Sequence, residues 1–310
     1  MTHLERTQKQ IQEWLDDIIP IEVTLNEETQ SKLDPEMTKA CHELHAFISC
    51  LYNDMYHNPA EYGILHEDKE TRERAVSRIH QTIWERIPDM NFENVNLEPL
   101  KVLQRCGLYI EETDSEIKIT NTKYPNMFLP LTKLRQAAKK NYAGSHVYQK
   151  CDFRLIANPK YQPTLEDITR NRTSPEMRAL LFEIDAYARA KNFRTECRVK
   201  ECIYYKFNGK RLFNIRVRRD EVHLEIGIGK LEHINEMEAV YPAEVRDFIR
   251  RNMNYCRNCF AHHNGGVEVV FFGRKVRICG GGPFLFIKNP KPENFGLIVK
   301  AIDLGCVQKK

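Results

Sequence analysis

An Asn-Gly pair, Asn208-Gly209, separates two runs of strand-like residues, Cys202–Phe207 and Arg211–Arg218. Asn and Gly both enter left-handed backbone conformations readily, and the pair is the strongest short-range signal for a two-residue turn between antiparallel strands. A third run of the same kind, Glu221–Gly227, follows within three residues. The sequence therefore predicts an antiparallel meander, and any fold for this chain has to accommodate it.

The two faces of this predicted meander differ in chemistry. Alternate residues of a strand point to opposite faces of a sheet, so each face can be listed from its parity. The apolar face, which we expect to be buried, comprises Phe213, Ile215, Val217, Val222, Leu224 and Ile226. The opposite face comprises Asn214, Arg216, Arg218, His223 and Glu225.

Residues 1–106 have the pattern of helices instead. Thr2 and Glu5 form a capping-box pair, and Asp34 before Pro35 combines a capping side chain with a preset backbone angle. Further helices are predicted from about Asp68 and over about Leu97–Arg105, the last ending at Gly107. After this point short strands appear, which changes the expected architecture.

These patterns predict the α+β class, with a helical N-terminal region followed by an α+β region whose sheet is mainly antiparallel. Residues 1–106 form an acidic all-helical region, and residues 107–172 a small βα unit compatible with a winged helix. Residues 173–310 form a basic α+β domain with a Cys/His cluster. This cluster is the candidate for a zinc knuckle that would hold the domain together. A helix is expected to open this domain, with Thr173 and Glu176 as its capping pair.

Charge is distributed unevenly along the chain. Residues 1–100 carry 9 basic and 20 acidic side chains, whereas residues 101–310 carry 38 basic and 23 acidic ones. The overall charge of +4 does not reveal this difference between the two parts. The basic part is the place to look for an anionic partner. The alternative is that the two oppositely charged parts attract each other within one particle.

The basic excess is greatest between Arg189 and Arg219, with 11 Lys or Arg residues and only 2 acidic ones. Aromatic residues are interleaved with these cations, an arrangement that suits single-stranded nucleic acid or another polyanion. A second hairpin-like run, Phe271–Lys275, repeats the chemistry of Phe207–Arg211. The predicted polyanion-binding residues are Lys206, Lys210, Arg211, Arg216, Arg218, Arg274 and Lys275. The alternative is a solvated face, or a surface that docks the acidic helices, with Phe213 in the core.

A Cys/His cluster at residues 256–263 is the candidate metal site. Cys256 and Cys259 have the C-x2-C spacing that presents two thiolates to zinc from one turn, and Cys279 lies across a predicted hairpin. The candidate ligands are Cys256, Cys259, His262, His263 and Cys279. Four ligands closed around one ion would make the zinc structural, although the second C-x2-C of a zinc ribbon is missing from the sequence.

Other interpretations of the cluster remain open. The thiols could be buried small hydrophobes, or C-x2-C could be a redox pair, although such a pair normally opens a helix after a strand. An open coordination position would instead make the cluster a catalytic metal or redox site. A protein-interaction scaffold is a further alternative for the whole chain.

Catalytic signatures are missing from the sequence: no phosphate-binding G-x-x-x-x-G-K-[ST] loop, G-x-S-x-G elbow or G-x-G-x-x-G motif occurs. No catalytic residue is predicted, and a binding or regulatory protein is favoured over an enzyme. Met1–Leu15 lacks the apolar core of a signal peptide, and no run approaches the ~20 apolar residues of a membrane helix. We therefore expect a cytoplasmic protein that does not contact membranes.

Overall fold

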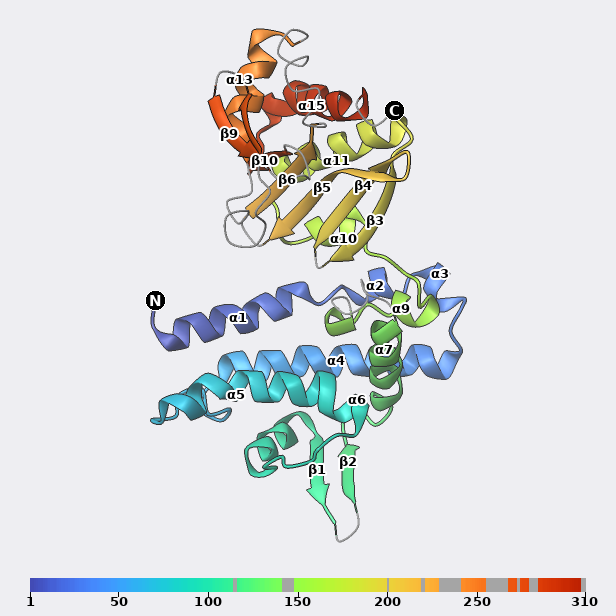
Figure 1. Cartoon of the computed structure of the whole chain (residues 1–310). Coiled ribbons are helices and arrows are strands. Elements are labelled where there is room, and N and C mark those ends of the chain that lie inside the picture. Colours follow the sequence, from blue (N-terminus) through green and yellow to red (C-terminus); the bar gives the residue numbers. More distant parts are fainter. Residues whose placement is uncertain are drawn as a thin grey trace. The chain divides into compact units, whose positions relative to one another are not determined.

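The computed structural model describes residues 1–113, 116–140, 148–199, 201–218, 221–228, 241–254, 267–271, 274–278 and 284–307. The chain divides into two compact units, Met1–Tyr161 and Gln162–Lys310 (Figure 1). Helices and sheets occur together, and the strand pairs of the described residues are all antiparallel. The predicted α+β class, with a helical N-terminal part and antiparallel sheets, is confirmed.

The N-terminal unit is mainly helical and contains one strand pair. Its helical elements are α1 (His3–Asp17), α2 (Ile21–Thr24), α3 (Glu27–Gln30), α4 (Pro35–His57), α5 (Lys69–Gln81), the π-helix η1 (Thr82–Arg86), α6 (Ile87–Asp89), the 3-10 helix η2 (Glu98–Cys106), α7 (Phe128–Lys140), the 3-10 helix η3 (Tyr148–Lys150) and α9 (Arg154–Ala157). Strands β1 (Leu108–Glu112) and β2 (Ile117–Asn121) pair in register, with Leu108 opposite Asn121.

Local capping signals position the main helices of this unit. The Asp34 carboxylate accepts a hydrogen bond from the Met37 amide at 2.6 Å and so satisfies one of the free amides that open α4. Asp68 does the same for α5 through Thr71, also at 2.6 Å. Gly107 ends η2 in the left-handed region, with a φ of 81°. All three predicted helix boundaries are confirmed.

One hydrophobic core holds the N-terminal unit together. It extends from Ile11 of α1 through Trp84 of the π-helix to Leu155 of α9. Leu108 of β1 and Leu131 of α7 belong to the same core, and both are fully buried. The residues after Gly107 therefore pack with the helices that precede them.

The C-terminal unit is built on a six-stranded sheet with the order β3-β4-β5-β6-β10-β7. Its strands are β3 (Arg194–Val199), β4 (Cys202–Phe207), β5 (Lys210–Arg218), β6 (Glu221–Gly227), β7 (Met253–Asn254) and β10 (Phe284–Lys288), and a separate hairpin comprises β8 (Val267–Phe271) and β9 (Arg274–Ile278). Its helical elements are α10 (Leu165–Thr169), α11 (Pro175–Ala190), α13 (Ala243–Asn252), the 3-10 helix η5 (Pro292–Asn294) and α15 (Phe295–Val307).

Helices α11 and α15 lie against one face of this sheet, here called the core face (Figure 1). On that face Tyr205 of β4 donates a hydrogen bond to Asp185 of α11 at 2.8 Å. The predicted buried set is confirmed, since its members are at most 2% exposed: Phe213, Ile215, Val217, Val222, Leu224 and Ile226. The Asn208-Gly209 turn is also confirmed, with φ values of 49° and 77°.

Two details of the prediction are corrected. The segment predicted as a helix over Leu97–Arg105 is helical, but it is a 3-10 helix over Glu98–Cys106. Helix α11 is capped by Ser174, whose hydroxyl accepts from the Met177 amide at 3.2 Å, one residue after the predicted Thr173. The predicted zinc knuckle falls on residues 255–266 and 279–283, which lie outside the described residues.

Candidate polyanion interface

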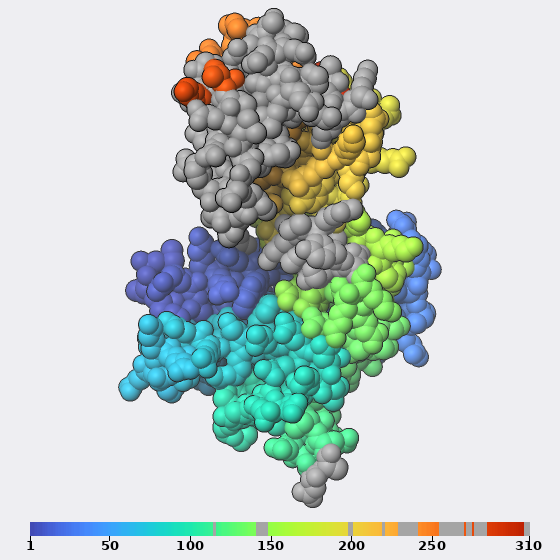
Figure 2. Space-filling view, in the orientation of Figure 1, coloured from blue at the N-terminus to red at the C-terminus, as the bar shows by residue number. Residues whose placement is uncertain are grey.

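The face of the sheet that points away from α11 and α15 carries four of the seven predicted cations, Lys206, Arg211, Arg216 and Arg218, and is called the outer face. Strand parity and register place on it Arg194, Glu196, Cys202, Tyr204, Lys206, Arg211, Asn214, Arg216, Arg218, Glu221, His223, Glu225 and Lys288. Figure 2 shows residues of β4 and β5, in gold, at the surface of the unit. The six Lys and Arg residues in this set outnumber its three glutamates, so the described outer face is basic.

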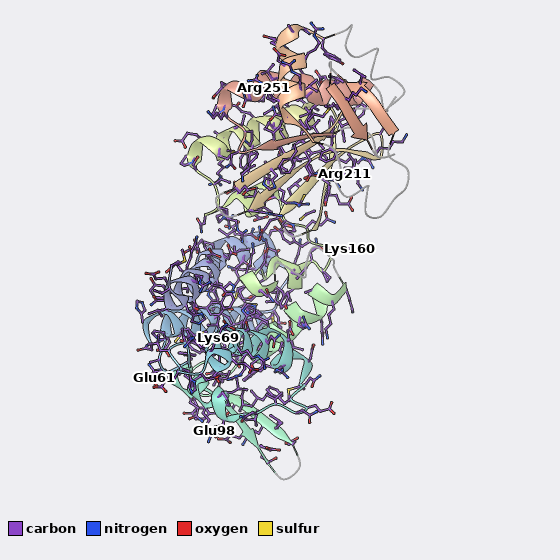
Figure 3. All side chains as sticks on the ribbon, turned by 60° about the vertical axis from the view of Figure 1, so that its left-hand side comes forward. Glu61, Lys69, Glu98, Lys160, Arg211 and Arg251 are labelled. Atoms are coloured by element: carbon purple, nitrogen blue, oxygen red, sulfur yellow. The ribbon has the colours of Figure 1, made fainter. Side chains whose placement is uncertain are left out.

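A β-bulge aims Arg211 at this face. In the pairing of β4 with β5, Lys206 lies opposite Arg211 and Tyr205 opposite Phe213, which leaves Leu212 as an extra residue. Leu212 and Phe213 are both buried, 2% and 0% exposed, whereas Arg211 projects from the sheet (Figure 3). The bulge thereby turns a strand that would bury position 211 into one that presents a cation.

Arg211 contacts a cluster of side chains formed by Tyr204, Glu225, Asn214 and Cys202. Its guanidinium carbon lies 4.2 Å from the centre of the Tyr204 ring, and its Nη2 lies 3.1 Å from Oε2 of Glu225. The same Glu225 oxygen accepts a hydrogen bond from Nδ2 of the fully buried Asn214 at 2.7 Å. The Cys202 thiol in turn donates to Oδ1 of Asn214 at 3.4 Å. These contacts connect Arg211, through Glu225 and Asn214, to Cys202.

Arg216 lies directly opposite Cys202 in the sheet. Burial raises the pKa of the Cys202 thiol, and its hydrogen bonds with Tyr204 and Arg216 oppose this increase only in part. Cys202 is therefore a neutral thiol at ordinary pH. The Nε of Arg216 is buried and has no hydrogen-bond partner within the described part of the chain, which leaves one donor of this cation unsatisfied.

Counter-ions hold several cations of the outer face. Lys206 forms an ion pair with Glu196, and Lys288 lies 3.0 Å from Glu221, which also contacts His223. The hydrogen bond from Lys288, followed by that from His223, lowers the pKa of Glu221. Two other cations of this face, Arg194 and Arg218, are exposed and form no ion pair within the described residues. The same holds for Lys210, which begins β5 opposite Phe207.

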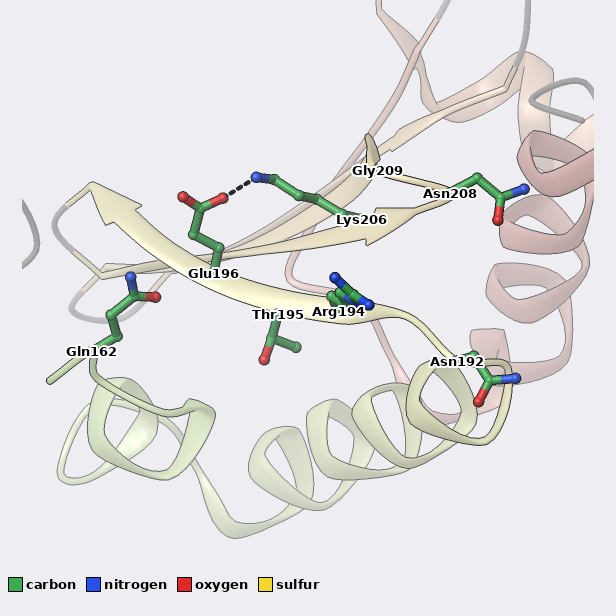
Figure 4. Close-up of a pocket in the computed structure, with 8 residues that line it drawn as sticks. All are labelled: Gln162, Asn192, Arg194, Thr195, Glu196, Lys206, Asn208 and Gly209. Carbon is green, nitrogen blue, oxygen red and sulfur yellow. Dashed lines mark ion pairs between the residues drawn. The ribbon is translucent and has the colours of Figure 1, made fainter. Parts of the chain in front are cut away.

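A pocket of about 670 Å³ opens where β3 forms the edge of the sheet (Figure 4). We call it the edge pocket, and its lining residues are Gln162, Asn192, Arg194, Thr195, Glu196, Lys206, Asn208 and Gly209. The ion pair of Glu196 with Lys206 forms part of its wall. The side chain of Gln162 accepts a hydrogen bond from the Cys197 amide at 3.0 Å and so covers one donor of the free edge.

The aromatic residues among the cations do not form a stacking surface. The Tyr205 and Phe213 rings stack on each other on the core face, with ring centroids 4.1 Å apart, and both residues are fully buried. Phe207 packs against Phe193, with ring centroids 5.2 Å apart, and the Tyr204 ring lies beneath the Arg211 guanidinium. The expectation that these rings are available to stack on bases is therefore wrong. Tyr205, Phe207 and Phe213 lie on the core face, and Tyr204, on the outer face beneath Arg211, is 8% exposed.

The remaining predicted cations lie on the separate hairpin. Arg274 begins β9 opposite Phe271, and Lys275 is exposed. All five predicted metal ligands, Cys256, Cys259, His262, His263 and Cys279, are outside the described residues. Elsewhere, in the part that the structure does describe, no group of three or more His, Cys, Asp or Glu could hold a metal ion.

The strands that flank these candidate ligands are described. Asn254, two residues before Cys256, pairs with Phe284, the first described residue after the Cys279 segment. Val267, four residues after His263, pairs with Ile278, the residue before Cys279. Both segments that carry the candidate ligands are thus anchored in strand pairs at their ends.

Comparison with protein-family models, with curated proteins and with solved structures found no match to this chain. No helix among the described residues is long and apolar enough to cross a membrane. Sequence reasoning missed Arg194, Gln162 and the edge pocket, although Arg194 lies within the basic stretch and could have been assigned once β3 was recognised as a strand.

Proposed function

We propose that the C-terminal unit binds nucleic acid or another polyanion through the outer face of its sheet. The observation that carries the proposal is the excess of cations on this face, where Arg194 and Arg218 are exposed without a counter-ion in the described part of the chain, as is Lys210 beside the adjoining turn. Polyanions release condensed counter-ions when such cations contact them, which favours binding.

The buried aromatic rings define the mode of binding. Since Tyr205 and Phe213 belong to the core, contacts would be made to phosphates or other anionic groups rather than to base faces. The preference for one nucleotide sequence over another should then be weak. The edge pocket, with Arg194 and Lys206 in its lining, is where a single anionic group would be held most closely.

The triple variant Arg194→Gln, Lys210→Gln, Arg218→Gln tests this proposal without breaking a described ion pair. In fluorescence anisotropy with a single-stranded oligonucleotide, we expect about tenfold weaker binding at low salt. The slope of log K against log salt should become shallower by about 2, because each lost phosphate contact removes ~0.7 from it. Heparin should compete with the oligonucleotide if charge alone is recognised.

The matched control is Lys9→Gln, Lys118→Gln, Lys140→Gln. It removes three exposed cations from the N-terminal unit and changes the net charge by the same amount. Binding should be nearly unchanged in this variant. An equal loss of affinity in both triple variants would refute the proposal. So would the absence of oligonucleotide binding by the unaltered protein at low salt.

We also propose that Cys256, Cys259, Cys279 and one of His262 and His263 hold a structural zinc ion. The C-x2-C spacing and the anchored flanking strands support this assignment, since the strand pairs of Asn254 with Phe284 and of Val267 with Ile278 limit how far the two segments can separate. The enzymatic alternative for this cluster and the scaffold alternative remain predictions, and no described contact favours them.

Elemental analysis of the full chain purified without chelators is expected to find ~1 zinc per chain, released only slowly to a chelator. Cys256→Ser and Cys279→Ser should each lose the metal and lower the melting temperature. Cys306→Ser, which alters a half-buried thiol of α15, serves as the control that retains zinc. Metal-free protein would rule out the zinc site, whereas a rapidly exchanging ion would favour the catalytic alternative.

A further inference from the structure

Two cysteines far apart in sequence face each other in the N-terminal unit. Cys50 lies in the last third of α4, and Cys106 is the last residue of η2. Their Sγ atoms are 3.8 Å apart, with the Cys50 thiol donating to the Cys106 sulfur. A disulfide requires an S–S distance of about 2.05 Å, so the two sulfur atoms must move closer before a covalent bond forms.

A chain of hydrogen bonds holds Cys106 in place. The Tyr62 hydroxyl lies 3.9 Å from its sulfur and donates its proton to Oδ2 of Asp54 at 2.7 Å. Because Tyr62 has one proton and the carboxylate is the stronger acceptor, the Cys106 thiol donates to the Tyr62 oxygen. Arg105 then closes the chain with two bonds to Asp54, at 2.7 and 3.1 Å. The sulfur is therefore oriented by its surroundings.

The backbone beside Cys106 is equally constrained. Gly107 has a φ of 81°, and a Cβ at this position would lie 2.8 Å from Cγ of Lys123. Lys123 itself donates from its Nζ to the carbonyl of Arg105 at 2.9 Å. The end of η2 is thus fixed against the turn that follows β2.

The two thiols differ in access to solvent. Cys106 is 1% exposed, and burial, with the adjacent Cys50 as a second cause, raises its pKa to about 12. Cys50 is half-buried. A reagent from solvent would therefore react with Cys50 first, and Cys106 is the adjacent buried thiol that can react with the product.

We propose that Cys50 and Cys106 are a site of reversible oxidation, at which a hydroperoxide converts the two thiols to a disulfide. The Cys50 thiolate attacks one oxygen of the hydroperoxide, the O–O bond breaks, and the other oxygen leaves as an alcohol or water. Cys50 is then a sulfenic acid. The Cys106 sulfur attacks this sulfur, the S–O bond breaks, and the hydroxyl leaves as water with the proton of Cys106.

Two thiols lose two protons and two electrons, and the hydroperoxide is reduced to one alcohol, or water, and one water. The product links α4 to the end of η2 and closes a loop that contains α5, the π-helix and α6. A cellular dithiol would restore the thiols by exchange. The proposal does not depend on polyanion binding by the other unit.

The test uses the reduced full chain and hydrogen peroxide. After oxidation, free thiols are alkylated and the protein is digested without reductant, and mass spectrometry should find the peptides of Cys50 and Cys106 joined. The link should disappear after dithiothreitol, and it should be absent from Cys50→Ser. Oxidation should raise the melting temperature of the N-terminal unit by about 5–10 °C, because the link restricts the unfolded chain.

Cys306→Ser is the matched control, since it alters another half-buried thiol and should leave the link intact. The main measurement is made on the unaltered protein, so the test does not require a variant of the buried Cys106, which could fail to fold. Three results would overturn the proposal: sulfinic acid at Cys50 without a link, Cys50 joined mainly to a different cysteine, or the same thermal shift in Cys50→Ser.

Discussion

Replacing Trp84 with alanine is expected to lower the free energy of unfolding of the N-terminal unit by about 3–5 kcal/mol. The indole is fully buried in the π-helix, and its Nε1 donates to the Tyr52 hydroxyl at 2.8 Å. Its ring also meets the edge of Tyr148, with centroids 5.5 Å apart. Truncation would leave a large cavity and remove the donor to a buried hydroxyl, so both effects lower stability.

Urea unfolding followed by the fluorescence of Trp14 measures this loss. The chain contains two tryptophans, Trp14 and Trp84, and both lie in the N-terminal unit, so the signal reports on that unit. Leu129→Ala is the control, because this side chain is 53% exposed and its truncation should change stability by no more than about 0.5 kcal/mol. A loss below 1 kcal/mol in Trp84→Ala would contradict the assignment of the indole to the centre of the core.

Two glycines of α15 should respond to alanine with opposite signs. A Cβ on Gly305 would lie 2.6 Å from Cδ1 of Leu212 and even closer to the carbonyl oxygen of Gly227, so the helix would have to move from the sheet. We expect Gly305→Ala to destabilise the C-terminal unit by about 1–3 kcal/mol. Gly296, in the first turn of the same helix, has open space around it, and Gly296→Ala should stabilise by up to about 1 kcal/mol.

Differential scanning calorimetry of the full chain distinguishes the two substitutions, because the melting transition of the C-terminal unit should move down in one and up in the other. Both variants make the same chemical change on the same helix, so helix propensity alone predicts the same sign for both. A neutral Gly305→Ala would show that α15 does not approach β6 as closely as described, and destabilisation by Gly296→Ala would show that the space around Gly296 is not open.

Features set by a few neighbouring residues were predictable from the sequence. The Asp34 cap, the left-handed Gly107 and the Asn208-Gly209 turn each follow from the backbone preference of one or two residues. The buried set of the meander was equally accessible, because parity alone assigns Phe213 and Ile215 to one face. These predictions succeed because no information from distant residues enters them.

Features that depend on pairing between strands were not predictable in the same way. The bulge at Leu212 shifts the register of β5 against β4, and it alone explains why Arg211 and Asn214 reach the same face. Pro99 gave no indication that its helix would be of the 3-10 type, and we have no physical account of that choice. Local propensity does not contain these outcomes, because they arise from packing between elements.

The candidate site was predictable in its cations and not in its arrangement. Lys206 and Arg211 were named from the basic stretch, but their partners Glu196 and Glu225 belong to strands on either side. The edge pocket joins Gln162 to Arg194 and Asn208, three separate stretches of the chain, so it follows only from the folded structure. The interleaved aromatic residues were misleading, because a stretch rich in both classes does not show which face each residue takes.

The hydrogen bond from the Cys197 amide to Gln162 bears on how this protein behaves at high concentration. A free edge strand offers a row of amides and carbonyls to which a strand of another molecule can add, which is how sheets polymerise into fibrils. Gln162 occupies one position in that row on β3, and the described part of β7 at the opposite edge comprises Met253 and Asn254. The row of free amides on β3 is thus interrupted, which makes this edge a poorer template for a strand of another molecule.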